Sequence, residues 1–225
     1  SIQKCFNNDN IKLCIVDNDT TVESFTSLND IKGTASFNIE IIRSDKNRFY
    51  WGGAKLGLDK YLNDVQKFDW IIVCNNDIEF NDDKFFQKLS NLNRDEYQII
   101  APQIKSTYSE KDLNPFLLNP ISKIQDFYYR LYYISAVTAK LIHKIGRLIN
   151  QQSTINNQQS IIQSIYAPHG SCMIFSNHYF IKGGYLDTGF TMYGEEVSTA
   201  EIAKKMNTNI YYIPELSLVH RDHQS

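Results

Sequence analysis

Short apolar runs alternate along the chain with amphipathic segments, which is the pattern of strands alternating with helices. Helices are predicted at residues 51–62, 83–92 and 195–206. Such an alternation favours an α/β fold in which a mainly parallel sheet is covered by helices on both faces. The predicted strands are residues 12–16, 39–42, 69–74, 98–101, 165–166, 171–175 and 210–213, and Pro102 is expected to end the fourth.

The middle of the chain breaks this alternation. Residues 105–120 are polar and contain two prolines, which predicts a loop, and residues 150–160 have no apolar face, which predicts a mobile connector. Residues 121–149 have helical apolar spacing, with Lys and Arg gathered within about a third of the circumference. That helix could lie on an anionic inner leaflet, or could pack on the sheet with a solvated basic rim. We therefore expect one catalytic domain over residues 1–225, with 121–160 as a variable insertion for acceptor or membrane contact.

Composition narrows the class of protein. The 225 residues are 42% hydrophobic, which suits a globular domain with a real core, and the net charge of −2 gives no reason to expect nucleic acid. No apolar run approaches the roughly 20 residues that span a bilayer. The four cysteines are scattered without a CxxC pair, so neither zinc nor a disulfide framework is expected, and a reduced cytosolic compartment fits best.

The most informative polar group is Asn75-Asn76-Asp77, which directly follows the strand predicted at 69–74. Open α/β sheets bind ligands beyond the carboxyl ends of their strands. A carboxylate there can hold a hard divalent cation against a phosphate. A polar and acidic stretch at 78–83 follows at once. These residues point to nucleotide-phosphate chemistry.

Several further segments occur in an order that resembles family 2 glycosyltransferases, which have the GT-A fold. The resemblance is to the bacterial branch that builds capsular and O-antigen polysaccharide, including rhamnosyltransferase-like members. Each segment is weak alone, but seven in order cover almost the whole chain. They are residues 15–18 (IVDN), 47–57, 75–77 (NND), 170–175 (GSCMIF), 183–187 (GGYLD), 193–196 (YGEE) with 200–201, and 212–216 (YIPEL) with His220.

The resemblance implies a role for each acidic group. Asp17 would receive the nucleotide base, although Asp-Asn-Asp-Thr is also ordinary turn-capping chemistry. Asp77 would bind Mg²⁺ or Mn²⁺ that bridges the donor diphosphate. Glu196 would deprotonate the acceptor hydroxyl, while Glu195 would orient or bind the acceptor. Two adjacent carboxylates can raise one pKa, and they also complement a helix N-terminus.

Other positions are carried over less directly. His220 would lie near the metal or diphosphate, just past the last strand, and His169 and Gly170 would line the acceptor pocket. Lys55 departs from the family, because many members have Asn or Arg there, but a cation could still reach phosphate. Donor contacts are also implied for Asn18, Asn47, Gly53 and Asn76. The family's first strand is missing before Ser1, so we expect the native chain to extend further on that side.

Together these residues predict an inverting, metal-dependent hexosyltransferase. It would move a sugar from a UDP- or dTDP-type donor to a glycan or polyprenyl-linked acceptor in cell-surface polysaccharide synthesis. The enzyme would be cytoplasmic, with possible peripheral contact with the inner leaflet. The alternatives are an inactive GT-A-like module that binds glycans or partners, and a nucleotidyltransferase.

Overall fold

The computed structural model describes residues 11–34, 38–122, 161–191 and 193–221. The chain divides into two compact units, one made of Ser1–Leu118 with Ser160–Ser225, the other of Asn119–Gln159. Apart from residues 119–122, the second unit lies outside the described residues, and with it the predicted helix and connector of the insertion. The account below concerns the first unit.

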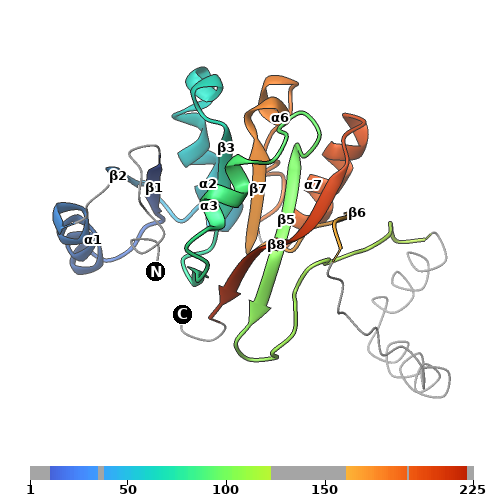
Figure 1. Ribbon diagram of the computed structural model, residues 1–225. Coiled ribbons are helices and arrows are strands. Elements are labelled where there is room, and N and C mark those ends of the chain that lie inside the picture. Colours follow the sequence, from blue (N-terminus) through green and yellow to red (C-terminus); the bar gives the residue numbers. More distant parts are fainter. Residues whose placement is uncertain (1–10, 35–37, 123–160, 192, 222–225) are drawn as a thin grey trace, which may run out of the picture. The chain divides into compact units, whose positions relative to one another are not determined.

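The elements of this unit follow the predicted alternation (Figure 1). In chain order they are β1 (Lys12–Asp17), α1 (Val22–Thr34), β2 (Asn38–Arg43), α2 (Phe49–Asp59), the 3-10 helix η2 (Leu62–Lys67), β3 (Trp70–Cys74), β4 (Ile78–Phe80), α3 (Phe85–Ser90), β5 (Ile99–Ser106), β6 (Gln163–Ile165), β7 (Cys172–Ser176), α6 (Asn177–Ile181), α7 (Glu195–Lys205) and β8 (Ile210–His220).

The strands form two sheets. β1 and β2 pair in parallel, and the other six form a sheet in the order β3-β7-β5-β8-β4, with β6 also paired to β8. In the larger sheet β5 and β8 are parallel, and the remaining pairs are antiparallel. The alternation predicted a mainly parallel sheet, whereas the described strands are mixed in direction. β7 runs antiparallel to both β3 and β5, and β4 and β6 run antiparallel to β8, so three of the six strands oppose the other three.

Each face of the larger sheet has its own apolar core. Along β7, Met173 and Phe175 belong to one cluster of buried residues, and Cys172 and Ile174 belong to the other, as the alternation of a strand requires. Helices therefore cover both faces, as predicted. The first cluster is covered by Trp51 and Leu58 of α2, Val65 of η2, Tyr179 and Phe180 of α6, and Ala200, Ile202 and Ala203 of α7, and the second by Phe85 and Leu89 of α3.

Two strands run past prolines, of which Pro102 was expected to end its strand. β5 continues through Pro102 to Ser106, and β8 continues through Pro214 to His220. The register between the two strands jumps from Pro102 opposite Ile213 to Gln103 opposite Ser217, so residues 214–216 form a bulge. A proline that cannot donate to the ladder is tolerated at such a bulge. This extension places His220 inside β8 rather than beyond it.

Three other boundaries differ from the prediction. α2 ends at Asp59, and η2 follows as a separate 3-10 helix, so no single helix spans 51–62. α3 covers only Phe85–Ser90, and residues 78–80, for which no strand was predicted, form β4 because they pair with β8. The side chains of Ile78 and Phe80 are buried in the sheet, and tertiary pairing overrides the polar residues around them.

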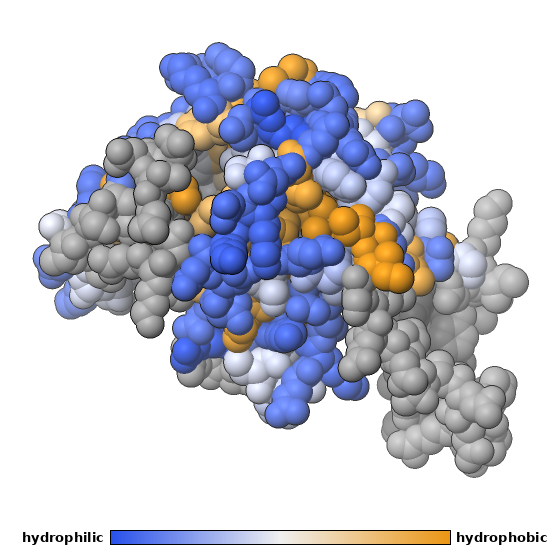
Figure 2. Space-filling view, in the orientation of Figure 1, coloured by the Kyte–Doolittle hydropathy of each residue, from blue (hydrophilic) through white to orange (hydrophobic). Residues whose placement is uncertain are grey.

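The surface drawn in Figure 2 is mainly hydrophilic, with a compact apolar patch. Exposed large apolar side chains occur next to the insertion, among them Phe116, Leu118, Ile161 and Ile162. Among the described residues, no helix is both long enough and apolar enough to cross a membrane.

Candidate active site

The carboxyl end of β1 presents Asp17, which is almost fully buried. Its Oδ1 accepts a hydrogen bond from the Thr20 amide at 3.1 Å, so the turn-capping role is present. Its Oδ2 receives no hydrogen bond from the described residues, and Arg43 Nε lies 3.5 Å away. One carboxylate oxygen is used by the turn, and the other has only the Arg43 guanidinium beside it among the described residues.

Asn18 ties β1 to the loop that leads into α2. Its Nδ2 donates to Asn47 Oδ1 at 3.0 Å and to the Phe49 carbonyl at 3.1 Å, while its Oδ1 accepts the Arg48 amide at 2.7 Å. Phe49 has a φ of 57°, a conformation that non-glycine residues adopt only when their surroundings impose it. The structure therefore brings Asn18 and Asn47, two of the residues to which donor contacts were assigned, together beside Asp17.

The start of α2 packs against β1. A Cβ at Gly57 would lie 3.0 Å from Val16 Cγ2, whereas one at Gly53 would meet Asn18 only at an ordinary 3.8 Å. Gly53 therefore adjoins the predicted donor side, and Gly57 marks the closest approach of the helix. Lys55 is directed elsewhere, because its Nζ lies 2.6 Å from Asp59 Oδ2 in an exposed ion pair. The structure does not bring Lys55 to the other donor residues.

Asp77 and His220 meet where β4 pairs with the end of β8. Ile78, the residue after Asp77, lies opposite His220 in the register, and His220 Nε2 is 3.2 Å from Asp77 Oδ1. Asp77 Oδ1 is buried and receives no hydrogen bond from the described residues. A carboxylate oxygen beside an imidazole nitrogen is a donor set that fits Mn²⁺ or Mg²⁺.

This pair would supply only part of a coordination shell. In the described ranges, no group of three or more His, Cys, Asp or Glu side chains is placed to hold a metal ion. A cation bound by Asp77 and His220 would therefore need diphosphate and water oxygens as further ligands. The neighbouring Asn76 is exposed, and Arg221 donates its Nε to Glu79 at 2.7 Å rather than facing Asp77. Asp77 was predicted to bind a cation that bridges the donor diphosphate, and a shell completed by diphosphate oxygens is consistent with that prediction.

A three-residue turn, His169-Gly170-Ser171, leads into β7. The Ser171 carbonyl accepts the Asn75 amide at 2.9 Å, which attaches the turn to the end of β3. His169 Nδ1 accepts the Ser171 amide at 3.2 Å and lies 2.8 Å from Ser171 Oγ. Because Nδ1 accepts an N–H, the neutral imidazole of His169 carries its proton on Nε2.

Gly170 lies against both glutamates. Its amide donates to Glu196 Oε1 at 3.2 Å, and its carbonyl accepts the Tyr50 hydroxyl at 2.9 Å. A Cβ at this position would stand 2.8 Å from the Oε1 atoms of both Glu195 and Glu196, which is closer than real side chains allow. A side chain here would displace the two carboxylates, so glycine allows both glutamates to lie against the turn before β7.

The glutamates begin α7, directly after two residues with unusual backbone angles. Gly194 has a φ of 136° and Tyr193 a φ of 58°. Both carboxylates lie in the first turn, where the helix dipole favours negative charge. Even so, burial, together with the charge of Glu195, raises the pKa of Glu196 above its ordinary value, against the lowering effect of backbone hydrogen bonds. Glu196 is the carboxylate poised to accept a proton.

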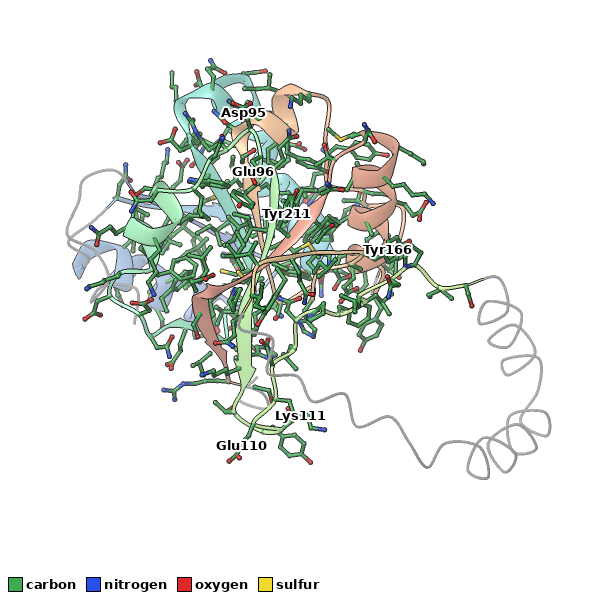
Figure 3. The ribbon with its side chains drawn as sticks, turned by 45° about the vertical axis from the view of Figure 1, so that its right-hand side comes forward. Asp95, Glu96, Glu110, Lys111, Tyr166 and Tyr211 are labelled. Carbon is green, nitrogen blue, oxygen red and sulfur yellow. The ribbon has the colours of Figure 1, made fainter. Side chains whose placement is uncertain are left out.

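Farther along α7, Glu201 has a different environment. Its Oε1 accepts the hydroxyl of Tyr166, which lies beside the helix (Figure 3), at 2.6 Å. The helix therefore carries acidic groups of two kinds: one pair in contact with Gly170, and one glutamate held by a tyrosine outside that contact. Glu201 provides a natural comparison for the first two.

Asn114 is a site residue that sequence reasoning missed. It is buried, its Nδ2 donates to the Pro102 carbonyl at 2.7 Å, and its Oδ1 accepts the His169 amide at 2.7 Å. The ring of Phe116 then lies 6.1 Å from that of His169, which in turn lies 6.4 Å from that of His220. The sequence signal was Asp112-Leu-Asn114-Pro115, in which Asp112 accepts the Asn114 amide as turn-forming aspartates do.

The segment that carries Asp77 and the pair of glutamates that begins α7 contact the same turn. Asp77 belongs to the segment whose Asn75 bonds Ser171, and Glu196 bonds Gly170. They are therefore not on opposite sides of the molecule. Asp17, Asn18, Asn47 and Gly53 form a second group at the end of β1.

Comparison with known proteins decides the family. The model of glycosyl transferase family 2 matches residues 1–183. The chain belongs to this family. The match includes Asp17, Asp77 and the Gly170 turn, whereas Glu196 and His220 follow the matched segment.

The chain is also similar in sequence to one curated protein and in structure to one solved protein. The chain is 25% identical over 183 residues to the low-salt glycan biosynthesis hexosyltransferase Agl10 of Haloferax volcanii, which covers 81% of this chain and 52% of that protein. It is also similar to the crystal structure of GalNAc-T7 with UDP, GalNAc and Mn²⁺, with a TM-score of 0.58 and 12% identity over 93% of this chain and 37% of that one. The chain spans about half the length of the curated relative and less of the solved structure. The predicted GT-A fold is confirmed.

Proposed function

We propose that this chain is the catalytic part of an inverting hexosyltransferase that uses a nucleoside diphosphate sugar. The observation that carries the proposal is the Gly170 turn, which contacts Glu196 on one side and the Asp77 segment on the other. Family membership and the curated hexosyltransferase relative support the same reaction. A transferase needs a leaving-group site and a base within reach of one sugar, and this turn adjoins candidates for both.

Glu196 is the proposed general base. It takes the proton of the acceptor hydroxyl as that oxygen attacks the anomeric carbon, and the nucleoside diphosphate departs from the opposite side. A raised pKa suits this role, because a stronger base gains more from the proton transfer. Glu195 and Gly170, which touch the same region, are proposed to orient the acceptor with His169.

The donor is proposed to extend from Asp17 to Asp77. The unsatisfied Asp17 Oδ2 would accept a ring N–H of uracil or thymine, and Asn18 and Asn47 would hold the loop beside it. Asp77 and His220 would hold a divalent cation, for which Mn²⁺ in the structurally similar GalNAc-T7 is support. Such a cation neutralises charge that develops on the departing diphosphate.

The biological setting is a finer proposal. We propose a glycan or polyprenyl-linked acceptor in cell-surface polysaccharide synthesis. The similarity to Agl10, a glycan biosynthesis hexosyltransferase of Haloferax volcanii, supports a glycan acceptor. The capsular, rhamnosyltransferase-like branch and a bacterial source rest on the sequence segments alone. So does peripheral membrane contact through the basic insertion at the cytoplasmic face.

The direct test is isothermal titration of the chain with UDP and with dTDP, each with and without Mn²⁺, followed by a panel of nucleotide sugars. The proposal predicts binding that depends on Mn²⁺ and release of nucleoside diphosphate from one donor in the panel. Binding without turnover of any donor and acceptor pair would favour an inactive glycan-binding module. No binding under any of these conditions would contradict the proposal.

A further inference from the structure

Two cysteines that the proposed reaction does not use lie directly opposite each other in the sheet. Cys74 is the last residue of β3, and Cys172 is the first residue of β7, and the antiparallel register pairs them. Both belong to the same face, since Cys172 is a member of the second core cluster and Cys74 packs against that cluster. Both are free thiols.

The hydrogen-bond pattern fixes what kind of pair they form. The Asn75 amide donates to the Ser171 carbonyl at 2.9 Å, and the Asn177 amide donates to the Asp69 carbonyl at 3.2 Å. Asn75 with Ser171, and Asp69 with Asn177, are therefore hydrogen-bonded pairs of the ladder. Hydrogen-bonded and non-hydrogen-bonded pairs alternate along an antiparallel ladder, so the pairs at Trp70, Ile72 and Cys74 are non-hydrogen-bonded. Cys74 and Cys172 form a non-hydrogen-bonded pair, in which Cα atoms stand about 4.5 Å apart and side chains approach most closely. That spacing lies within the range of about 4.4–6.8 Å that a disulfide spans.

The two thiols also interact. The Cys172 thiol hydrogen-bonds to the sulfur of Cys74, which lowers the pKa of Cys74, while that bond and burial raise the pKa of Cys172. Cys74 is partly exposed, and Cys172 is fully buried. Cys74 is the candidate for the attacking sulfur, because its residue is the more exposed of the two and its pKa is the one that is lowered, and Cys172 is the candidate for the resolving sulfur.

We propose that Cys74 and Cys172 are a redox-active dithiol that closes to a reversible disulfide next to the donor site. With hydrogen peroxide as oxidant, the Cys74 thiolate attacks one oxygen, the O–O bond breaks, and hydroxide leaves, giving a sulfenic acid. The Cys172 sulfur then loses its proton and attacks the Cys74 sulfur, and the second oxygen leaves as water. Two thiols and one peroxide thus become one disulfide and two waters.

The position of the bond would couple it to ligand binding. Asn75, which follows Cys74, begins the segment that ends at Asp77, and Ser171, which precedes Cys172, bonds both Asn75 and His169. A spacing of about 4.5 Å is at the short end of the disulfide range, whose commonest value is about 5.5–6 Å, so closing the bond should spread the strand ends that carry these residues. The oxidised form should therefore bind UDP and Mn²⁺ less well. This consequence rests on the proposed function, whereas disulfide formation does not.

The experiment treats the folded chain with hydrogen peroxide, blocks remaining thiols with N-ethylmaleimide, and maps linked peptides by mass spectrometry without reduction. The expected product joins the Cys74 and Cys172 peptides, forms also in the Cys14→Ser variant, and disappears on reduction with dithiothreitol. In parallel, titration with UDP and Mn²⁺ should show at least tenfold weaker binding after oxidation and recovery after reduction.

Cys74→Ala, at the partly exposed position, should lose the linked peptide and keep its affinity in peroxide, with a thermal melt to confirm folding. If both cysteines are recovered alkylated after peroxide, or are linked only after unfolding in urea, the dithiol proposal is overturned. Linkage with unchanged UDP affinity would overturn the coupling. Failure of the reduced chain to bind UDP would count against the proposed function and leave the peptide result as the test of the dithiol.

Discussion

The amide of Gly170 donates a hydrogen bond to Glu196 Oε1 at 3.2 Å, with no room for a side chain between them. This contact ties the start of α7 to the turn before β7. The same turn is held to the end of β3 through Ser171 and Asn75. The proposed base and the proposed cation site are therefore positioned by one short piece of backbone, and the predictions below follow from that arrangement.

Glu196→Gln should abolish sugar transfer while leaving the affinity for UDP and Mn²⁺ within about twofold. Loss of a general base typically lowers the rate by about 10² to 10⁴, and in the proposed mechanism Glu196 acts on the acceptor rather than on the nucleotide. The matched control is Glu201→Gln on the same helix, whose carboxylate binds Tyr166, and which should keep its transfer rate. Equal loss of transfer and nucleotide affinity in the Glu196 variant would show a structural role.

The transfer rate should depend on pH through Glu196. Because its pKa is raised above the ordinary value of 4.5, kcat/KM should fall as the pH drops through that higher pKa and the base becomes protonated. Glu195→Gln removes the like charge that contributes to the raised pKa, so it should move this acid limb toward lower pH. An acid limb that stays in place in the Glu195 variant would mean that the two carboxylates are not coupled.

Gly170→Ala should cost most of the transfer activity, because the new Cβ would stand 2.8 Å from the Oε1 atoms of both glutamates and force them away. Mn²⁺-dependent UDP binding should change far less. Gly33→Ala serves as the control, since no atom lies within 4 Å of a Cβ built there. Steady-state rates and nucleotide titrations of both variants check the prediction, and full activity of Gly170→Ala would contradict it.

Asn114→Ala should destabilise the chain by about 1–3 kcal/mol for each buried group left unsatisfied, namely the Pro102 carbonyl and the His169 amide. Urea unfolding measures this loss. Because the amide of His169 is no longer held, KM for the acceptor should also rise. Asn209→Ala, at an exposed position, should leave both quantities unchanged. If the free energy of unfolding is unchanged in the Asn114 variant, the two hydrogen bonds of the Asn114 side chain do not stabilise this turn.

The sequence identified what short-range patterns encode. Cys14, Cys74 and Cys172 were placed in strands by the apolar runs around them, and each lies in one. The start of α7 at Glu195 also followed from local chemistry. These features depend on neighbours within a few residues, so hydrophobic period, glycine and acidic first turns were sufficient to find them.

What the sequence did not reveal depends on partners far along the chain. Pro102 and Pro214 stay within strands because the ladder between β5 and β8 has a bulge at this point. Ile78 belongs to a strand because it pairs with His220 of β8. The contact of Asn114 with His169 and the pairing of Cys74 with Cys172 each join segments that are far apart in the sequence, so local patterns could not reveal them. Lys55 was assigned to phosphate, but a neighbour in the sequence decides its position. Its ammonium group forms an ion pair with Asp59, one helical turn away.

The central claim is that a cation-bound diphosphate at Asp77 and the base Glu196 serve the same sugar. It is tested most directly by a crystal structure of the chain with Mn²⁺ and an unreactive nucleotide sugar. We predict Mn²⁺ bound by Asp77 and by the diphosphate, with the anomeric carbon facing the Glu196 carboxylate beside Gly170. A cation bound away from Asp77, or a sugar turned away from Glu196, would contradict the account.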